Sequence, residues 1–96
     1  MAELTLVSPS HRPLQPLVEG ALQNELRLLE AGIRRSEQRL HEFEARYGLS
    51  TADFVQRYEH DELEETLEFA EWIGEHRLRA RLLEKADALR AIRFAD

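Results

Sequence analysis

The stretch RYGLSTADF, residues 46–54, is the one clean break in a chain that otherwise has the pattern of long helices. Gly48 stands where the C-terminus of a helix favours a left-handed residue. Ser50 has the character of a helix N-cap, with Asp53 at the capping-box position. Two apolar residues flank this cap with the spacing of a hydrophobic staple, Leu49 and Phe54. Each residue therefore ends one helix or begins the next, and we interpret the stretch as a corner rather than a catalytic loop.

A seam of residues that alternates steps of four and three predicts a long helix before the corner. Its members are Leu22, Leu26, Leu29, Ile33, Ser36, Leu40, Phe43 and Tyr47. Gly32 lies beside this seam and should cost about 1 kcal/mol in a helix interior. We interpret Gly32 as a position where a neighbouring helix comes close.

The segment after the corner predicts a short helix over residues 51–58 and a third helix over about residues 62–91. Asp61 is the candidate N-cap of the third helix, with Glu64 at the capping-box position. One apolar stripe follows the third helix in steps of four and three: Phe69, Ile73, His76, Ala80 and Leu83.

These elements predict an all-α fold, a long coiled-coil-like helical hairpin with a short helix at the corner. Residues 1–16 are expected to be an N-terminal tail, because their three prolines oppose a helix, and residues 4–7 could form a short strand in it. Residues 17–94 would be the helical hairpin domain. Two helices of about 30 residues expose much apolar surface, so we expect a homodimer that forms a four-helix arrangement.

Composition narrows the class of function. The net charge of −6 makes nucleic acid an unlikely partner and suits a basic protein instead. The chain has no Cys, which excludes disulfides and thiolate chemistry. Neither a signal peptide nor a membrane-spanning apolar run is recognisable, and we expect a cytoplasmic protein.

Candidate catalytic and metal motifs are weak. No Glu-x-x-His motif of a di-iron bundle is present, and His60 with Glu64 is more typical of a surface contact than of a metal site. A magnesium-dependent nucleotide pyrophosphohydrolase of the MazG type would use two acidic pairs, Glu68 with Glu71 and Glu84 with Asp87. On one straight helix these pairs would be about 24 Å apart and could not share an ion. We therefore expect no enzyme, no metal ligand and no cofactor.

Several motifs together resemble a family of small prokaryotic helical proteins. The resemblance covers most of the chain and rests on the run from Phe43 to Leu49, on Phe54 and Tyr58, and on the acidic run that ends at Glu71-Trp72. Many of these proteins look like antitoxins, some of them encoded beside toxins of the TumE type. The family often has Gly-Asp-Asp where this chain reads Glu64-Glu65-Thr66-Leu67. The resemblance implies neutralisation of a toxin by binding, and it implies no catalytic residue.

The leading hypothesis is a non-catalytic interaction module, an antitoxin-like protein that binds a small basic toxin through its acidic corner. The alternatives are a structural homodimeric coiled coil and the MazG-like hydrolase. Seven acids and no base lie between residues 59 and 71. The expected partner contacts are Tyr58, Glu62, Glu65, Glu68 and Trp72, with Trp72 as the hot spot because large aromatics dominate interface energies.

Overall fold

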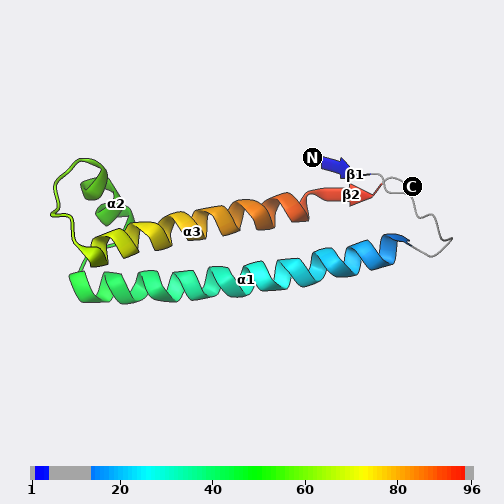
Figure 1. Ribbon diagram of the computed structural model, residues 1–96, viewed down its shortest axis with the longest axis horizontal. Coiled ribbons are helices and arrows are strands. Elements are labelled where there is room, and N and C mark those ends of the chain that lie inside the picture. The colour runs from blue at the N-terminus through cyan, green and yellow to red at the C-terminus, as the bar shows by residue number, and fades with distance from the viewer. Residues whose placement is uncertain (1, 5–13, 95–96) are drawn as a thin grey trace.

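The computed structural model describes residues 2–4 and 14–94, and these form a long antiparallel helical hairpin (Figure 1). Helix α1 spans Leu14–Tyr47, the short helix α2 spans Thr51–Glu59 at the corner, and helix α3 spans Leu67–Arg90. Strands β1 (Ala2–Leu4) and β2 (Ile92–Phe94) pair in parallel at the opposite end. The predicted helical hairpin with a short helix at its corner is confirmed.

The corner has the predicted local chemistry. Gly48 adopts a left-handed φ of 65°, and its amide donates to the Glu44 carbonyl oxygen at 2.9 Å. The Ser50 hydroxyl caps α2 by accepting from the Asp53 amide at 3.1 Å. The Glu44 carboxylate adds a bond that was not predicted, accepting from the Thr51 amide at 2.7 Å. The end of α1 and the start of α2 are therefore both capped by residues close to them in the sequence.

Two predicted helix boundaries are wrong. Helix α1 begins at Leu14 and contains Pro16 in its first turn, where a helix loses nothing because its amides have no partner there. Helix α3 begins at Leu67, after Thr66 rather than Asp61 as the N-cap, and the Thr66 hydroxyl accepts from the Phe69 amide at 3.1 Å.

Asp61 ends α2 instead of starting α3. Its φ of 53° is left-handed, a conformation that Asp tolerates better than most residues. The Glu62 amide donates to the Arg57 carbonyl at 2.9 Å, and the Asp61 amide donates to the Tyr58 carbonyl at 3.3 Å. This is the bond pattern of a Schellman motif. The connector, residues 60–66, is consequently a non-helical link between α2 and α3.

The predicted seam of α1 faces α3. Five of its eight members are buried: Leu29, Ile33, Ser36, Leu40 and Phe43. Gly32 does mark a close approach, since a Cβ atom there would lie 3.2 Å from the Leu82 Cδ1 atom. The predicted stripe of α3 is only partly right. Ile73 is buried, but Ala80 is exposed, and Trp72 and Ala86 are buried in its place.

The core has two separate apolar clusters. The cluster at the corner contains Leu40, Phe43, Phe54, Trp72 and Ile73. The other, toward the β strands, contains Leu29, Ile33 and Ala86. Polar contacts join the helices between them: the Ser36 hydroxyl donates to the Glu75 carboxylate at 2.7 Å, and Arg79 contacts Glu37 at 2.9 Å.

The ends of the chain pair with each other. Strands β1 and β2 align Ala2 with Ile92 and Leu4 with Phe94. The strand predicted at residues 4–7 is present only at Leu4, and residues 5–7 lie outside the described part of the chain. Residues 92–94 were included in the predicted helical hairpin domain, beyond its third helix, and form β2 instead. No helix in the described part of the chain is both long enough and apolar enough to cross a membrane.

Candidate protein-interaction surface

Trp72, the expected hot spot, is a core residue, and its assignment as a partner contact is wrong. Its exposed fraction is 0%. Its ring stacks on Phe54 at a centroid distance of 3.8 Å and lies 5.5 Å from Phe43. The indole Nε1 donates to the Thr51 hydroxyl at 3.1 Å, which satisfies its polar atom inside the core. Trp72 therefore joins all three helices at the corner and offers no surface to a partner.

The other four expected contacts lie at or near the surface of the corner. Glu62 and Glu65 are exposed on the connector. Tyr58 is half-buried on α2, with its ring 5.7 Å from that of Phe54. Glu68 is half-buried at the start of α3 and forms an ion pair with Arg46 of α1. Only the two connector carboxylates are therefore fully free for a partner.

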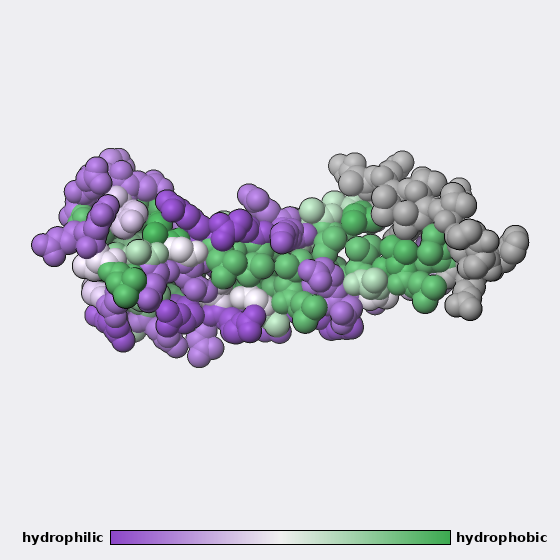
Figure 2. All heavy atoms as spheres, in the orientation of Figure 1, coloured by the Kyte–Doolittle hydropathy of each residue, from purple (hydrophilic) through white to green (hydrophobic). Residues whose placement is uncertain are grey.

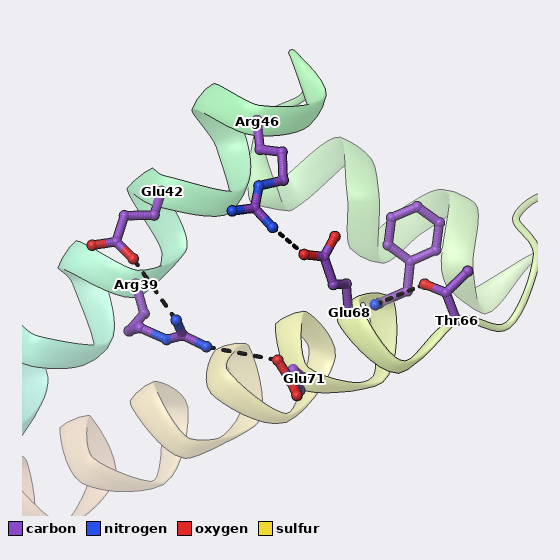
Figure 3. Close-up of polar contacts among 7 residues, drawn as sticks. Arg39, Glu42, Arg46, Thr66, Glu68 and Glu71 are labelled. Carbon is purple, nitrogen blue, oxygen red and sulfur yellow. Dashed lines mark hydrogen bonds and ion pairs between the residues drawn. The ribbon is translucent and has the colours of Figure 1, made fainter.

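Helix α1 neutralises the later acids of the run. Figure 3 shows Arg46 directed at Glu68, and Arg39 placed between Glu42 and Glu71. The Arg39 nitrogens lie 3.8 Å from the nearest oxygen of each of its two partners. These exposed pairs contribute little stability, in the range of about 0–1 kcal/mol each. They do reduce the charge that this side of the corner presents.

The earlier acids of the run remain unpaired. We call them the acidic tip: Glu59, Asp61, Glu62, Glu64 and Glu65. All five are exposed, and within the described residues none of them forms an ion pair. Leu63 packs against the corner cluster between them. This contact holds the connector against the core, so the neighbouring carboxylates lie on a backbone segment that is anchored to the core.

An exposed leucine adjoins the acidic tip. Leu67 is the first residue of α3, and 76% of its surface is exposed. Leu67 does not pack against the corner cluster, whereas Phe69, two residues later in the same turn, does. The position of Leu67 immediately after the Thr66 cap is the signal that could have identified it. An apolar side chain beside unpaired carboxylates can add buried area to an electrostatic contact.

The metal-site alternatives receive no support from the geometry. Glu68, Glu71, Glu84 and Asp87 all lie on the continuous helix α3, which has no break at Gly74. Within one chain the two acidic pairs therefore cannot share an ion. In the described part of the chain no group of three or more His, Asp or Glu side chains is placed to hold a metal ion.

Comparisons with known proteins add no assignment: no family model matches the chain, and searches of curated proteins and of solved structures gave no match either. Functional inference therefore depends on the surface chemistry of the corner and on the resemblance of its sequence motifs.

Proposed function

We propose that this chain is a non-catalytic, cytoplasmic interaction module, an antitoxin-like protein that binds a small basic toxin through the acidic tip and Leu67. The observation that carries the proposal is the set of five exposed carboxylates of the acidic tip, four of them on a connector that is held to the core, which form no ion pair with the residues that the structure describes. Such a surface attracts a basic protein and accelerates the encounter. The basic active surface of the toxin would then be covered, which neutralises it without chemistry.

The two parts of the surface have different tasks in this proposal. Glu62, Glu64 and Glu65 supply the long-range attraction and orient the partner. Leu67 supplies apolar area that is removed from water on binding, worth about 1.5–3 kcal/mol if fully buried. Affinity should consequently fall as salt rises, since exposed charges are screened within about 8 Å at physiological ionic strength.

The experiment is a matched pull-down followed by a growth assay. The wild-type chain is compared with a tip variant (Glu62→Gln, Glu64→Gln, Glu65→Gln) and with a control variant (Glu19→Gln, Glu25→Gln, Glu84→Gln), and the two variants have equal net charge. We expect the wild type and the control to retain one small basic partner, and the tip variant to lose it.

Neutralisation is then tested directly with that partner. The partner should arrest growth when produced alone, and the wild type and the control should relieve the arrest while the tip variant should not. A partner that binds the tip variant equally well, or that never affects growth, would contradict the proposal. Recovery of the chain without a partner would favour the alternative, a structural homodimer.

A further inference from the structure

One long face of the hairpin is apolar over the half farther from the corner. We call it the distal face and define it by Leu17 and Leu28 of α1 and Leu78 and Leu82 of α3. Leu17 and Leu28 are 63% and 61% exposed, and they are three helical turns apart on the same side of α1. Leu78 is 38% exposed. Figure 2 shows apolar surface between the two helices, running from the middle of the hairpin away from the corner.

The distal face is hollowed where it meets the corner half of the hairpin. A groove of about 520 Å³ lies between α1 and α3, lined by Leu28, Gly32, Leu78 and Leu82. Leu82 packs over Gly32 at one side of the groove, since a Cβ atom on Gly32 would lie 3.2 Å from the Leu82 Cδ1 atom, and two exposed leucines lie beside it. Charged residues border the groove on its corner side, among them Arg35, Arg39 and Glu75. An apolar floor inside a polar rim is the arrangement of a protein interface.

The chain exposes enough surface area for a second molecule to bind over the distal face. The surface of the chain is 7305 Å², whereas a compact monomer of 11.2 kDa exposes about 5,700 Å². The excess is about 1,600 Å², and a stable interface removes about 800 Å² from each partner. A thin hairpin of 60 × 21 × 18 Å can therefore bury a standard interface along one side.

We infer that the distal face is the interface of an antiparallel homodimer, in which two hairpins form a four-helix arrangement. The occupant is a second copy because the face is apolar and self-complementary, with exposed leucines beside a groove that leucines can enter. An isologous contact of this kind closes with twofold symmetry. This inference does not depend on the proposed function, since it involves neither the acidic tip nor Leu67.

The distribution of charged residues along the hairpin favours an antiparallel orientation of the two copies. A parallel dimer would place each residue opposite its own copy, including the ion-paired Arg39, Glu71, Arg46 and Glu68 on the corner half of the same face. Burying those pairs against identical pairs would cost desolvation and like-charge repulsion. An antiparallel pair centred near Leu28 places each distal half against the corner half of the other copy, with Leu17 at the level of Arg39, so that the ion pairs do not meet identical ion pairs. Both acidic tips then lie at the outer ends, where they are accessible.

The experiment compares two leucine variants by sedimentation equilibrium. The wild type should have twice the mass of one chain. Leu28→Glu should raise the dimer dissociation constant about a hundredfold, since two copies of a buried leucine are lost. Leu67→Glu changes a leucine that is more exposed than Leu28 but lies outside the face, and it should leave the dimer unchanged. A monomeric wild type, an unchanged dissociation constant for Leu28→Glu, or equal effects of both variants would overturn the inference.

A distance measurement tests the orientation with the face intact. The chain has no cysteine, so a spin label on Ala45→Cys reports one site per copy. Ala45 is exposed on α1, 17 residues from Leu28. Pulsed electron paramagnetic resonance should give about 50 Å between the two labels in the antiparallel dimer. A separation of about 20 Å, the spacing of two adjacent helix pairs, would overturn the antiparallel arrangement.

Discussion

Trp72 carries more of the fold than any other single residue. It stacks between rings of α1 and α2 and donates its indole hydrogen to Thr51, so one side chain connects three helices. The sequence pattern indicates that Trp72 packs against other residues. It does not show whether those residues belong to the core of this chain or to a partner. The rotation of α3 on α1 decides this.

Replacing Trp72 with Ala should therefore lower the free energy of unfolding by about 3–5 kcal/mol, since it removes a large buried ring and a hydrogen bond. Leu67→Ala, on the same helix but 76% exposed, should change it by less than about 0.5 kcal/mol. Urea denaturation followed by circular dichroism measures both. If Trp72→Ala left the stability unchanged and weakened partner binding, Trp72 would be a partner contact and not a core residue.

Two glycines, Gly48 and Gly74, test how backbone conformation affects the stability of the helices. Gly48 has a φ of 65°, so Gly48→Ala should destabilise the chain by about 1–2 kcal/mol. Gly74 lies inside α3, and nothing would lie within 4 Å of an added Cβ atom, so Gly74→Ala should stabilise it by about 0.5–1 kcal/mol. The same denaturation experiment compares them. A gain in stability for Gly48→Ala would contradict its role as a helix terminator.

At the scale of the elements, local signals predicted the corner well and the start of α3 poorly. Gly48 and Ser50 act through backbone bonds that are local in sequence, so their positions could be predicted directly. The connector contains two residues that could be the N-cap of α3, Asp61 and Thr66. Asp61 adopts the left-handed conformation that ends α2, and Leu63 then packs on the corner cluster. Thr66 consequently becomes the cap of α3.

Polar contacts between α1 and α3 also act between elements, and the bond from Ser36 to Glu75 is one of them. Ser36→Ala should cost about 1–3 kcal/mol, because it leaves the half-buried Glu75 carboxylate without its donor. The double variant Ser36→Ala, Glu75→Leu should recover most of this loss, since both polar partners are removed together. A double-mutant cycle in urea measures the coupling. Independent, additive effects would show that the bond contributes nothing.

At the scale of the whole molecule, the two apolar clusters are small and the surface is large. Helices of this kind gain most of their stability from packing rather than from propensity. A second copy on the distal face would add to that packing, and the acidic tips would still be accessible at both ends. The dimer would then have two copies of the proposed partner site, one on each chain.

The melting temperature should accordingly rise with protein concentration, since dimerisation stabilises the folded state by mass action. Differential scanning calorimetry over a wide concentration range measures this. The Leu28→Glu variant should melt at a lower temperature that does not depend on concentration. A concentration-independent melting temperature for the wild type would argue against the dimer.

The sequence by itself determined the corner, the hairpin and the seam of α1, because capping and helical periodicity act within a few residues. Only the tertiary structure decided that Trp72 is buried, that Leu67 is exposed and that β1 pairs with β2. It also decided which acids are free, since Arg46 and Arg39 reach Glu68 and Glu71 from another helix. These outcomes depend on the rotation of α3 against α1, which is set by side chains more than twenty residues apart.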